Sequence, residues 1–266
     1  MIRKTRPGKL DEIHYLLGNS CNLNCDFCFW DFKLPDFPIE FKKRIIDQIV
    51  STGIKKVTVS GGEPLCDKNF MDVLSYMHKL GLEIILHTNG LKITQGSLKK
   101  IATFISRISL TMDGIDEDIL FQMRKNRDIT RHTIFLVKQF HKLNIPVSIK
   151  TLVTKINYRE IVKIGKVLNN LPIQYWSLFQ FVPIGRGKTH KDKFYISPKL
   201  FDKVCMNLKN EFPSLSIHIR RPKQSPDKYC FIAANGKVYT YDKDAGDIFV
   251  GDLEAEDLSS IIPRIQ

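Results

Sequence analysis

Three cysteines stand within eight residues of the chain, at Cys21, Cys25 and Cys28, with the spacing C-x3-C-x2-C. Cysteine thiolates are the usual ligands of iron–sulfur clusters, and four of them normally hold one cluster. Three thiols on so short a loop can reach three irons of a 4Fe–4S cube and leave the fourth iron open. An open metal position is typical of a catalytic site, as it is in zinc enzymes. The spacing therefore predicts a catalytic 4Fe–4S cluster.

A second motif lies after the next expected strand. Residues 55–60 (KKVTVS) read as a buried strand, and Gly61-Gly62-Glu63-Pro64 follows directly. Two adjacent glycines allow bare backbone to approach a ligand, because no Cβ stands in the way. Together the two motifs make the sequence resemble the radical SAM superfamily, in which a GGEP-like turn holds the methionine amino group of S-adenosylmethionine (SAM).

The resemblance implies the chemistry and the cofactors. Radical SAM enzymes use a 4Fe–4S cluster to cleave SAM reductively into a 5′-deoxyadenosyl radical, which abstracts hydrogen from the substrate. The protein positions the cofactor, sets the electrostatics and keeps out quenching solvent. A reductant such as flavodoxin or ferredoxin is the implied electron donor.

Composition limits the remaining function classes. The chain has 266 residues, of which 43% are hydrophobic, so it can build a large core and is not a disordered chain. No apolar run approaches the ~20 residues of a membrane span, and the basic segment 1–7 lacks the apolar core of a signal peptide. We expect a cytoplasmic protein without a membrane partner. The net charge of +13 favours an anionic substrate, but the lysines are spread along the chain and predict no nucleic-acid surface.

Apolar periodicity predicts strands that alternate with helices, which implies a parallel sheet. The expected strands are 12–17, 55–60, 82–87, 107–111, 147–153 and 175–182, and the expected helices are 38–51, 69–80, 97–104, 130–143, 159–168 and 198–212. Six βα units match the partial (βα)6 TIM-like barrel of radical SAM proteins, in which chemistry lies at the carboxyl ends of the strands. We place this core at 1–215 and a C-terminal β-hairpin extension at 216–266, where Asn235-Gly236 separates two apolar runs.

The resemblance also suggests residues that contact SAM. Phe27 precedes the third cysteine, and its family counterpart packs beside the adenine. Thr88 and Asn89 follow the third strand, where they could contact the ribose or carboxylate or form a plain turn. Ser109 lies on the fourth strand, and Arg124 stands where a family arginine lies near the cofactor carboxylate; a surface arginine is the alternative.

Four residues are candidates for substrate binding. Lys150 interrupts an apolar strand, and a lysine inside a barrel needs an anionic partner. Gln180 is a lone amide in the sixth strand. Arg186 and Lys188 lie in a Gly-Arg-Gly-Lys segment after that strand, which could be a cationic lip for phosphate or carboxylate or an ordinary basic loop.

The substrate stays open between a small molecule, a nucleotide and a peptide. The segment YWSLFQ, residues 175–180, resembles a stretch of viperin-like nucleotide dehydratases, but Tyr175 and Ser177 replace two basic residues associated there with triphosphate binding. The C-terminal hairpin resembles that of ribosomal-peptide maturases, without their auxiliary-cluster cysteines. From a different class, the cysteines could stabilise a zinc-containing nucleic-acid-binding module, although no fourth ligand stands at finger spacing.

Overall fold

The computed structural model describes residues 10–29, 35–222, 229–242 and 246–265. The basic segment 1–7, considered above for targeting, lies outside these ranges. The described strands form one sheet in the order β10-β9-β8-β1-β2-β3-β4-β5-β6-β7. Their bounds are β1 Glu12–Gly18, β2 Lys56–Gly61, β3 Glu83–His87, β4 Arg107–Thr111, β5 Val147–Val153, β6 Tyr175–Gln180, β7 Ile217–Arg220, β8 Cys230–Ile232, β9 Lys237–Asp242 and β10 Gly246–Asp252.

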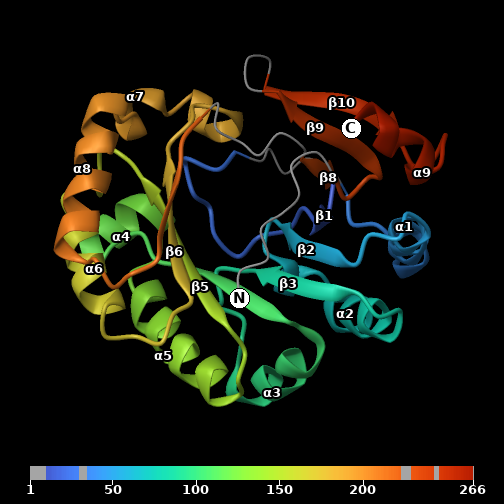
Figure 1. Ribbon diagram of the computed structural model, residues 1–266, viewed down its shortest axis with the longest axis horizontal. Coiled ribbons are helices and arrows are strands. Elements are labelled where there is room, and N and C mark those ends of the chain that lie inside the picture. The colour runs from blue at the N-terminus through green and yellow to red at the C-terminus, as the bar shows by residue number, and fades with distance from the viewer. Residues whose placement is uncertain (1–9, 30–34, 223–228, 243–245, 266) are drawn as a thin grey trace.

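The sheet curves, and the helices cover its outer side (Figure 1). The α-helices are α1 Ile39–Ser51, α2 Phe70–Lys79, α3 Gln95–Phe104, α4 Glu117–Arg124, α5 Ile129–Lys142, α6 Ile161–Leu168, α7 Lys191–Phe194, α8 Pro198–Glu211 and α9 Leu258–Ile261, with short 3-10 turns η1 Pro64–Cys66, η2 Gly185–Lys188 and η3 Ile262–Arg264. Strands β1 to β7 run parallel to their neighbours, and the sheet does not close. The expected partial barrel is confirmed.

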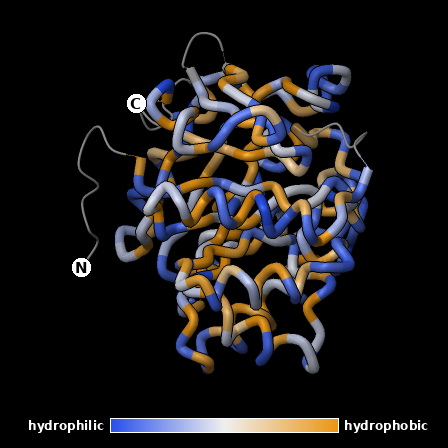
Figure 2. The backbone as a smooth tube through the Cα atoms, turned by 90° about the vertical axis from the view of Figure 1, so that its right-hand side faces the viewer, coloured by the Kyte–Doolittle hydropathy of each residue, from blue (hydrophilic) through white to orange (hydrophobic). Residues whose placement is uncertain are grey.

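The core lies between sheet and helices, as the apolar strands beneath the helices show (Figure 2). Alternate side chains of a strand face opposite sides of the sheet. On β1, Ile13, Tyr15 and Leu17 are fully buried in this core. The residues between them, Glu12 and His14, consequently lie on the inner, concave side. The same alternation places His87 and Lys150 on the inner side, because Leu86 and Ile149 belong to the core.

The predicted strands and helices of the barrel are confirmed, with ends that differ by a few residues. Helix α4 is an addition that the sequence did not predict. Asp116 caps it, since its carboxylate accepts hydrogen bonds from the N–H groups of Asp118 and Ile119, both at 3.0 Å. Such an N-cap is a standard helix start. The helix begins shortly after the turn at Asp113-Gly114, so the sequence pattern alone did not reveal it.

The C-terminal segment supplies both edges of the sheet. Strand β7 pairs with β6, whereas β8 pairs in parallel with β1 and begins the antiparallel run to β10. The predicted Asn235-Gly236 hairpin is confirmed, and Gly236 has the positive φ of 81° that such a turn uses. The predicted division at residue 215 stays a prediction.

Candidate active site

The cysteine loop, residues 21–28, follows β1 at the carboxyl end of the sheet. All three cysteines are free thiols, and the backbone N–H of Leu23 donates to Cys21 Sγ at 3.4 Å. Burial raises the pKa of Cys21 to about 11 and also raises that of Cys25. Neighbouring thiols contribute to both shifts, Cys25 to that of Cys21 and Cys28 to that of Cys25. Binding of a metal by these thiols would release protons.

The GGEP turn, residues 61–64, is bonded to the chain that leads into the cysteine loop. Gly62 N–H donates to Gly18 O at 3.0 Å, and Glu63 N–H donates to Ser20 O at 2.9 Å. A Cβ on Gly61, where φ is +137°, would lie 2.5 Å from Gly18 O, and one on Gly62 would lie 2.3 Å from Ser20 O. Both glycines are therefore required for this close approach of two backbones.

Glu63 ties a third segment to the site. Its buried carboxylate accepts hydrogen bonds from Thr88 Oγ1 at 2.5 Å, from Asn89 N–H at 2.7 Å and from Leu65 N–H at 3.3 Å. Asn89 Nδ2 also donates to Asn22 Oδ1, at 2.8 Å, within the cysteine loop. Burial raises the pKa of Glu63, and these donors oppose the shift. The network holds the turns after β2 and β3 against the cysteine loop.

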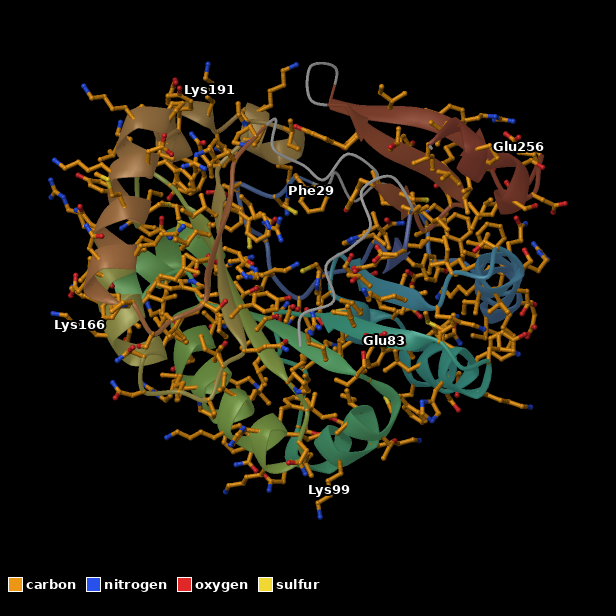
Figure 3. All side chains as sticks on the ribbon, in the orientation of Figure 1. Phe29, Glu83, Lys99, Lys166, Lys191 and Glu256 are labelled. Carbon is orange, nitrogen blue, oxygen red and sulfur yellow. The ribbon has the colours of Figure 1, made fainter. Side chains whose placement is uncertain are left out.

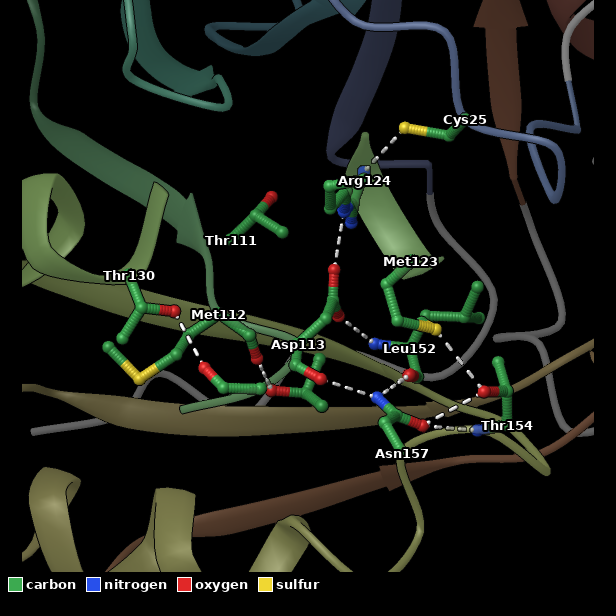
Figure 4. A network of polar contacts seen from close by, with 12 residues as sticks. Cys25, Thr111, Met112, Asp113, Met123, Arg124, Thr130, Leu152, Thr154 and Asn157 are labelled. Carbon is green, nitrogen blue, oxygen red and sulfur yellow. Dashed lines mark hydrogen bonds and ion pairs between the residues drawn. The ribbon is translucent and has the colours of Figure 1, made fainter. Parts of the chain in front are cut away.

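Arg124 connects the cysteine loop to the fourth strand (Figure 4). Its Nε donates to the fully buried carboxylate of Asp113, and its Nη1 lies 3.8 Å from Cys25 Sγ. Burial opposes the charge, but Asp113 and Cys25 together raise the pKa of Arg124. Asp113 is also held by Leu152 N–H, which donates to its carboxylate at 2.8 Å. The arginine is therefore an interior residue, and not the surface residue that the sequence left as an alternative.

Apolar side chains enclose the buried side of the cysteine loop. Phe27 packs edge-on against Phe194 with ring centroids 5.5 Å apart, and the Arg124 guanidinium lies 4.7 Å from the centre of the Phe27 ring. Cys25 packs in the same group of buried hydrophobic side chains as these two phenylalanines. Phe29, in contrast, is 53% exposed and lies over the opening of the ring of strands (Figure 3). This apolar surrounding suits a cluster that must be shielded from solvent.

The Gly-Arg-Gly-Lys segment forms turn η2 and packs on the cysteine loop. Arg186 N–H donates to Cys28 O at 2.9 Å, and Arg186 Nη1 donates to Asn24 Oδ1. Gly185 has a φ of +53°, and a Cβ there would lie 2.1 Å from Phe29 O. Arg186 thus clamps the loop, whereas Lys188 is exposed to solvent.

Two other predicted residues have protein partners. The hydroxyl of Ser109 lies 2.6 Å from that of Ser148 on the neighbouring strand. Gln180 has the same orientation as Trp176 and Leu178, which face the helices, and its Nε2 donates to Ile196 O at 3.4 Å. Their predicted contacts with SAM and substrate stay predictions, but Gln180 lies apart from the inner side of the sheet.

Lys150 lies on the inner side of the sheet, next to residues that the sequence did not indicate. Its Nζ lies 2.8 Å from Nδ1 and 3.1 Å from Nε2 of His87. The rings of His87 and His14 have centroids 6.3 Å apart. Burial lowers the pKa of Lys150 to about 7 and that of His14 to about 3, and it lowers the pKa of His87 well below its ordinary value. In the sequence, the one signal for this group of residues is the alternation along each strand. It places them on the same side of the sheet although they are far apart in the chain.

The family comparison identifies the class of protein. The model of the radical SAM superfamily matches residues 15–168, more than half of the chain, so the chain belongs to that superfamily. It is accordingly an enzyme of the radical SAM class. This result replaces the zinc-stabilised nucleic-acid-binding alternative.

Known relatives differ in what their names say they do. The chain is 28% identical over 209 residues to an AdoMet-dependent heme synthase of Methanosarcina barkeri, covering 77% of this chain and 58% of that protein. It is 25% identical over 203 residues to an S-adenosylmethionine-dependent nucleotide dehydratase of Lacinutrix mariniflava, covering 71% of this chain and 42% of that protein. The chain thus spans about half the length of these relatives.

Solved structures support the fold. The crystal structure of Streptococcus suis SuiB bound to precursor peptide SuiA matches with a TM-score of 0.76 at 17% identity, over 94% of this chain and 64% of that one. Within the described part of the chain, no helix is both long and apolar enough to cross a membrane.

Proposed function

We propose that the protein holds a 4Fe–4S cluster at Cys21, Cys25 and Cys28 and uses it to cleave SAM reductively. The observation that carries the proposal is the set of three free thiols on one loop, bonded to the GGEP turn and placed against Arg124. Within the described residues, no three metal-binding side chains converge on a single point. That arrangement favours a cluster, whose cysteines bind different irons, over one tetrahedral zinc ion.

The residues of the site fit such a cluster. Thiols are the ligand type that it requires, the Arg124 guanidinium offsets negative charge beside Cys25, and Phe27 and Phe194 limit solvent access. The chemistry that the cluster supplies when bound is electron transfer to SAM, which yields methionine and a 5′-deoxyadenosyl radical. A one-electron donor such as flavodoxin or ferredoxin would provide the electron, and we expect the protein in the cytoplasm.

The SAM site would lie where the three turns meet. The backbone of Gly61, Gly62, Glu63 and Pro64 would hold the methionine amino group. Phe27 would face the adenine, and Thr88, Asn89, Ser109 and Arg124 would contribute further polar contacts. The Glu63 carboxylate already has three donors within 3.3 Å. Its role is therefore to fix the geometry of the turn, and it transfers no proton.

The radical would abstract hydrogen from an anionic organic substrate held near Lys150, with Gln180, Arg186 and Lys188 as the weaker candidates. Lys150 supports this proposal because it is a half-buried cation whose described neighbours include a histidine and no carboxylate hydrogen-bond partner. Two narrower activities are nucleotide dehydration, favoured by the relative of Lacinutrix mariniflava, and peptide maturation, which the Streptococcus suis structure illustrates on the same fold.

Anaerobic reconstitution tests the proposal directly. The purified chain should bind about four irons, as a 4Fe–4S cluster requires, with negligible zinc. Dithionite and SAM should then yield 5′-deoxyadenosine, quantified by chromatography across a panel of nucleotides and peptides. A protein that binds zinc in place of iron, or that carries the cluster without cleaving SAM, would contradict the assignment.

A further inference from the structure

The inner side of the sheet carries more positive charge than its own residues balance. Basic side chains come from four strands there: His14 on β1, His87 on β3, Arg107 on β4 and Lys150 on β5. Electrostatic couplings tie them together, since Lys150, His14 and Arg107 all lower the pKa of His87, and Lys150 also lowers that of His14. Arg220 of β7 adds another cation that acts on Lys150.

Glu12, the acid of the described residues that raises the pKa of Lys150, already has other partners. Glu12 accepts a hydrogen bond from Thr58 Oγ1 at 2.5 Å, and its Oε1 lies 3.3 Å from His14 Nε2. Its other oxygen lies 4.0 Å from Lys56. Among the described residues, no carboxylate lies within ion-pair distance of Lys150 or Arg107. Burying an unpaired charge costs several kcal/mol in real proteins, so a cluster of this kind calls for an anion.

Arg107 provides a second, independent indication. Its Nη1 donates to the Tyr175 hydroxyl at 3.3 Å and its guanidinium lies 5.6 Å from the centre of the Tyr175 ring. Its Nε is buried and has no hydrogen-bond partner among the residues that the structure describes. Buried polar atoms are almost always paired, and an exception needs a reason such as an absent ligand. Arginine favours phosphate and carboxylate acceptors, which its planar fork matches.

The side chains are also accessible from the inner side. His14 keeps 23% of its side-chain surface accessible although protein surrounds it. His87, Arg107 and Lys150 are likewise half-buried and not sealed in the core. A ligand on the concave side of the sheet can therefore reach all four of them.

We propose that His87, Arg107 and Lys150 bind a phosphate group of the substrate on the inner side of the barrel, and that His14 supports them. The inference rests on the proposed function, which it narrows to a phosphorylated small molecule. Arg107 and protonated Lys150 together carry two positive charges, which exceed the charge of a single carboxylate and match the double charge of a phosphate, and the two histidines offer further ring nitrogens to its oxygens. When phosphate binds, Lys150 and His87 both take up protons, because a nearby anion favours the charged form of each.

Binding can be measured without SAM cleavage. Reconstituted protein is titrated calorimetrically with inorganic phosphate and, at equal ionic strength, with acetate. We expect phosphate to bind, and we expect Lys150→Met and Arg107→Gln each to weaken it at least about tenfold, the loss of one charged hydrogen bond. Lys166→Met, which removes an exposed cation of helix α6, should leave it unchanged. Circular dichroism confirms the fold of each variant.

The outcomes separate this inference from the proposed function. Dithionite-driven release of 5′-deoxyadenosine without substrate is measured separately on the wild type. A wild type that binds phosphate but releases no 5′-deoxyadenosine would contradict the proposed function and leave the phosphate site standing. Equal phosphate binding by the wild type, Lys150→Met and Arg107→Gln would overturn the phosphate site, and so would acetate binding as tight as that of phosphate. Displacement of phosphate by a nucleoside triphosphate or by ribose 5-phosphate, whichever acts at lower concentration, then names the source of the group.

Discussion

Two groups of polar side chains, one at the rim of the barrel and one on its inner side, differ in how completely the protein itself satisfies them. At the rim, Glu63 has three donors and Arg124 has a carboxylate partner. On the inner side, Lys150 contacts a histidine ring, and the Nε of Arg107 has no hydrogen-bond partner within the described ranges of the chain.

The difference indicates how far each region depends on a bound ligand for its geometry and charge. At the rim, Glu63 and Arg124 have protein partners, which hold the turns in place as catalysis by positioning requires. On the inner side, no carboxylate of the described residues pairs with Lys150 or Arg107, so the free-energy cost of desolvating these cations is not offset by an ion pair. Its geometry and charge should therefore respond to a ligand, whereas those of the rim should not.

The largest expected effect comes from removing a thiol at the rim. Cys25→Ala should abolish cluster binding, because two cysteines cannot hold the cube in place of three. Iron content should fall to background, and the visible absorption of the cluster and the release of 5′-deoxyadenosine should disappear with it. Cys205→Ala, which removes a buried thiol of helix α8, is the matched control and should retain its iron. Full iron content in Cys25→Ala would refute the cluster assignment.

The next effect tests whether the rim is held by its ion pair. Arg124→Gln leaves the Asp113 carboxylate buried without a cation, and breaking a buried pair in this way costs about 3–5 kcal/mol. Urea unfolding of the metal-free chain should show this loss. Arg124→Lys keeps the charge but cannot reach both Asp113 and Cys25, so it should recover only part of the stability. Identical unfolding midpoints for wild type and Arg124→Gln would mean that Asp113 is satisfied without the arginine.

The third effect concerns the inner side and depends on pH. Lys150 has a pKa of about 7 in the folded chain, against 10.5 as its ordinary value. Between these values the unfolded state holds a proton that the folded state lacks, so the free energy of unfolding rises with pH across this window. The slope should approach about 1.4 kcal/mol per pH unit. Comparing wild type with Lys150→Met between pH 7 and 9 isolates this contribution.

Adding phosphate provides a second test of the same pH dependence of unfolding. A bound anion raises the pKa of Lys150 towards its ordinary value. The pH range between the folded and unfolded pKa values then narrows, and the free energy of unfolding rises less with pH. The nearby groups that also titrate or carry charge are His14, His87, Glu12, Arg107 and Arg220, and all remain present in both proteins. Parallel pH profiles for wild type and Lys150→Met would show that Lys150 is solvated like a surface lysine.

The sequence predicts the rim far better than the inner side, and the reason is physical. Contacts at the rim come from short motifs, Cys21 to Cys28 and Gly61 to Pro64, in which neighbours in sequence are neighbours in space. Strand alternation likewise predicted the barrel. The sequence did not predict the capped helix α4, because Asp116 lies directly after a turn and the segment has little apolar periodicity.

The inner side is a product of register between distant strands. His87 and Lys150 are 63 residues apart and meet only because β3, β4 and β5 are neighbours in the sheet. The sequence indicated that Lys150 needs an anion but not which residues accompany it. For Arg186 the sequence suggested a cationic lip, and the structure adds contacts with Cys28 and Asn24 that the sequence did not indicate. Its predicted contact with substrate stays a prediction.

The smallest expected effect distinguishes those two readings of the Gly-Arg-Gly-Lys segment. Arg186→Ala removes the guanidinium that donates to Asn24, while the backbone bond from residue 186 to Cys28 O remains possible. Residues that orient metal ligands typically change metal affinity 10- to 100-fold when mutated, so the variant should lose iron to a chelator about 10- to 100-fold faster. Lys188→Ala, two residues away and exposed, should lose iron at the wild-type rate. If the two variants release iron equally, Arg186 does not hold the cysteine loop. If Arg186→Ala instead keeps its iron but loses phosphate affinity, the segment is a substrate contact, and the rim would then share the dependence on ligand that we assign to the inner side alone.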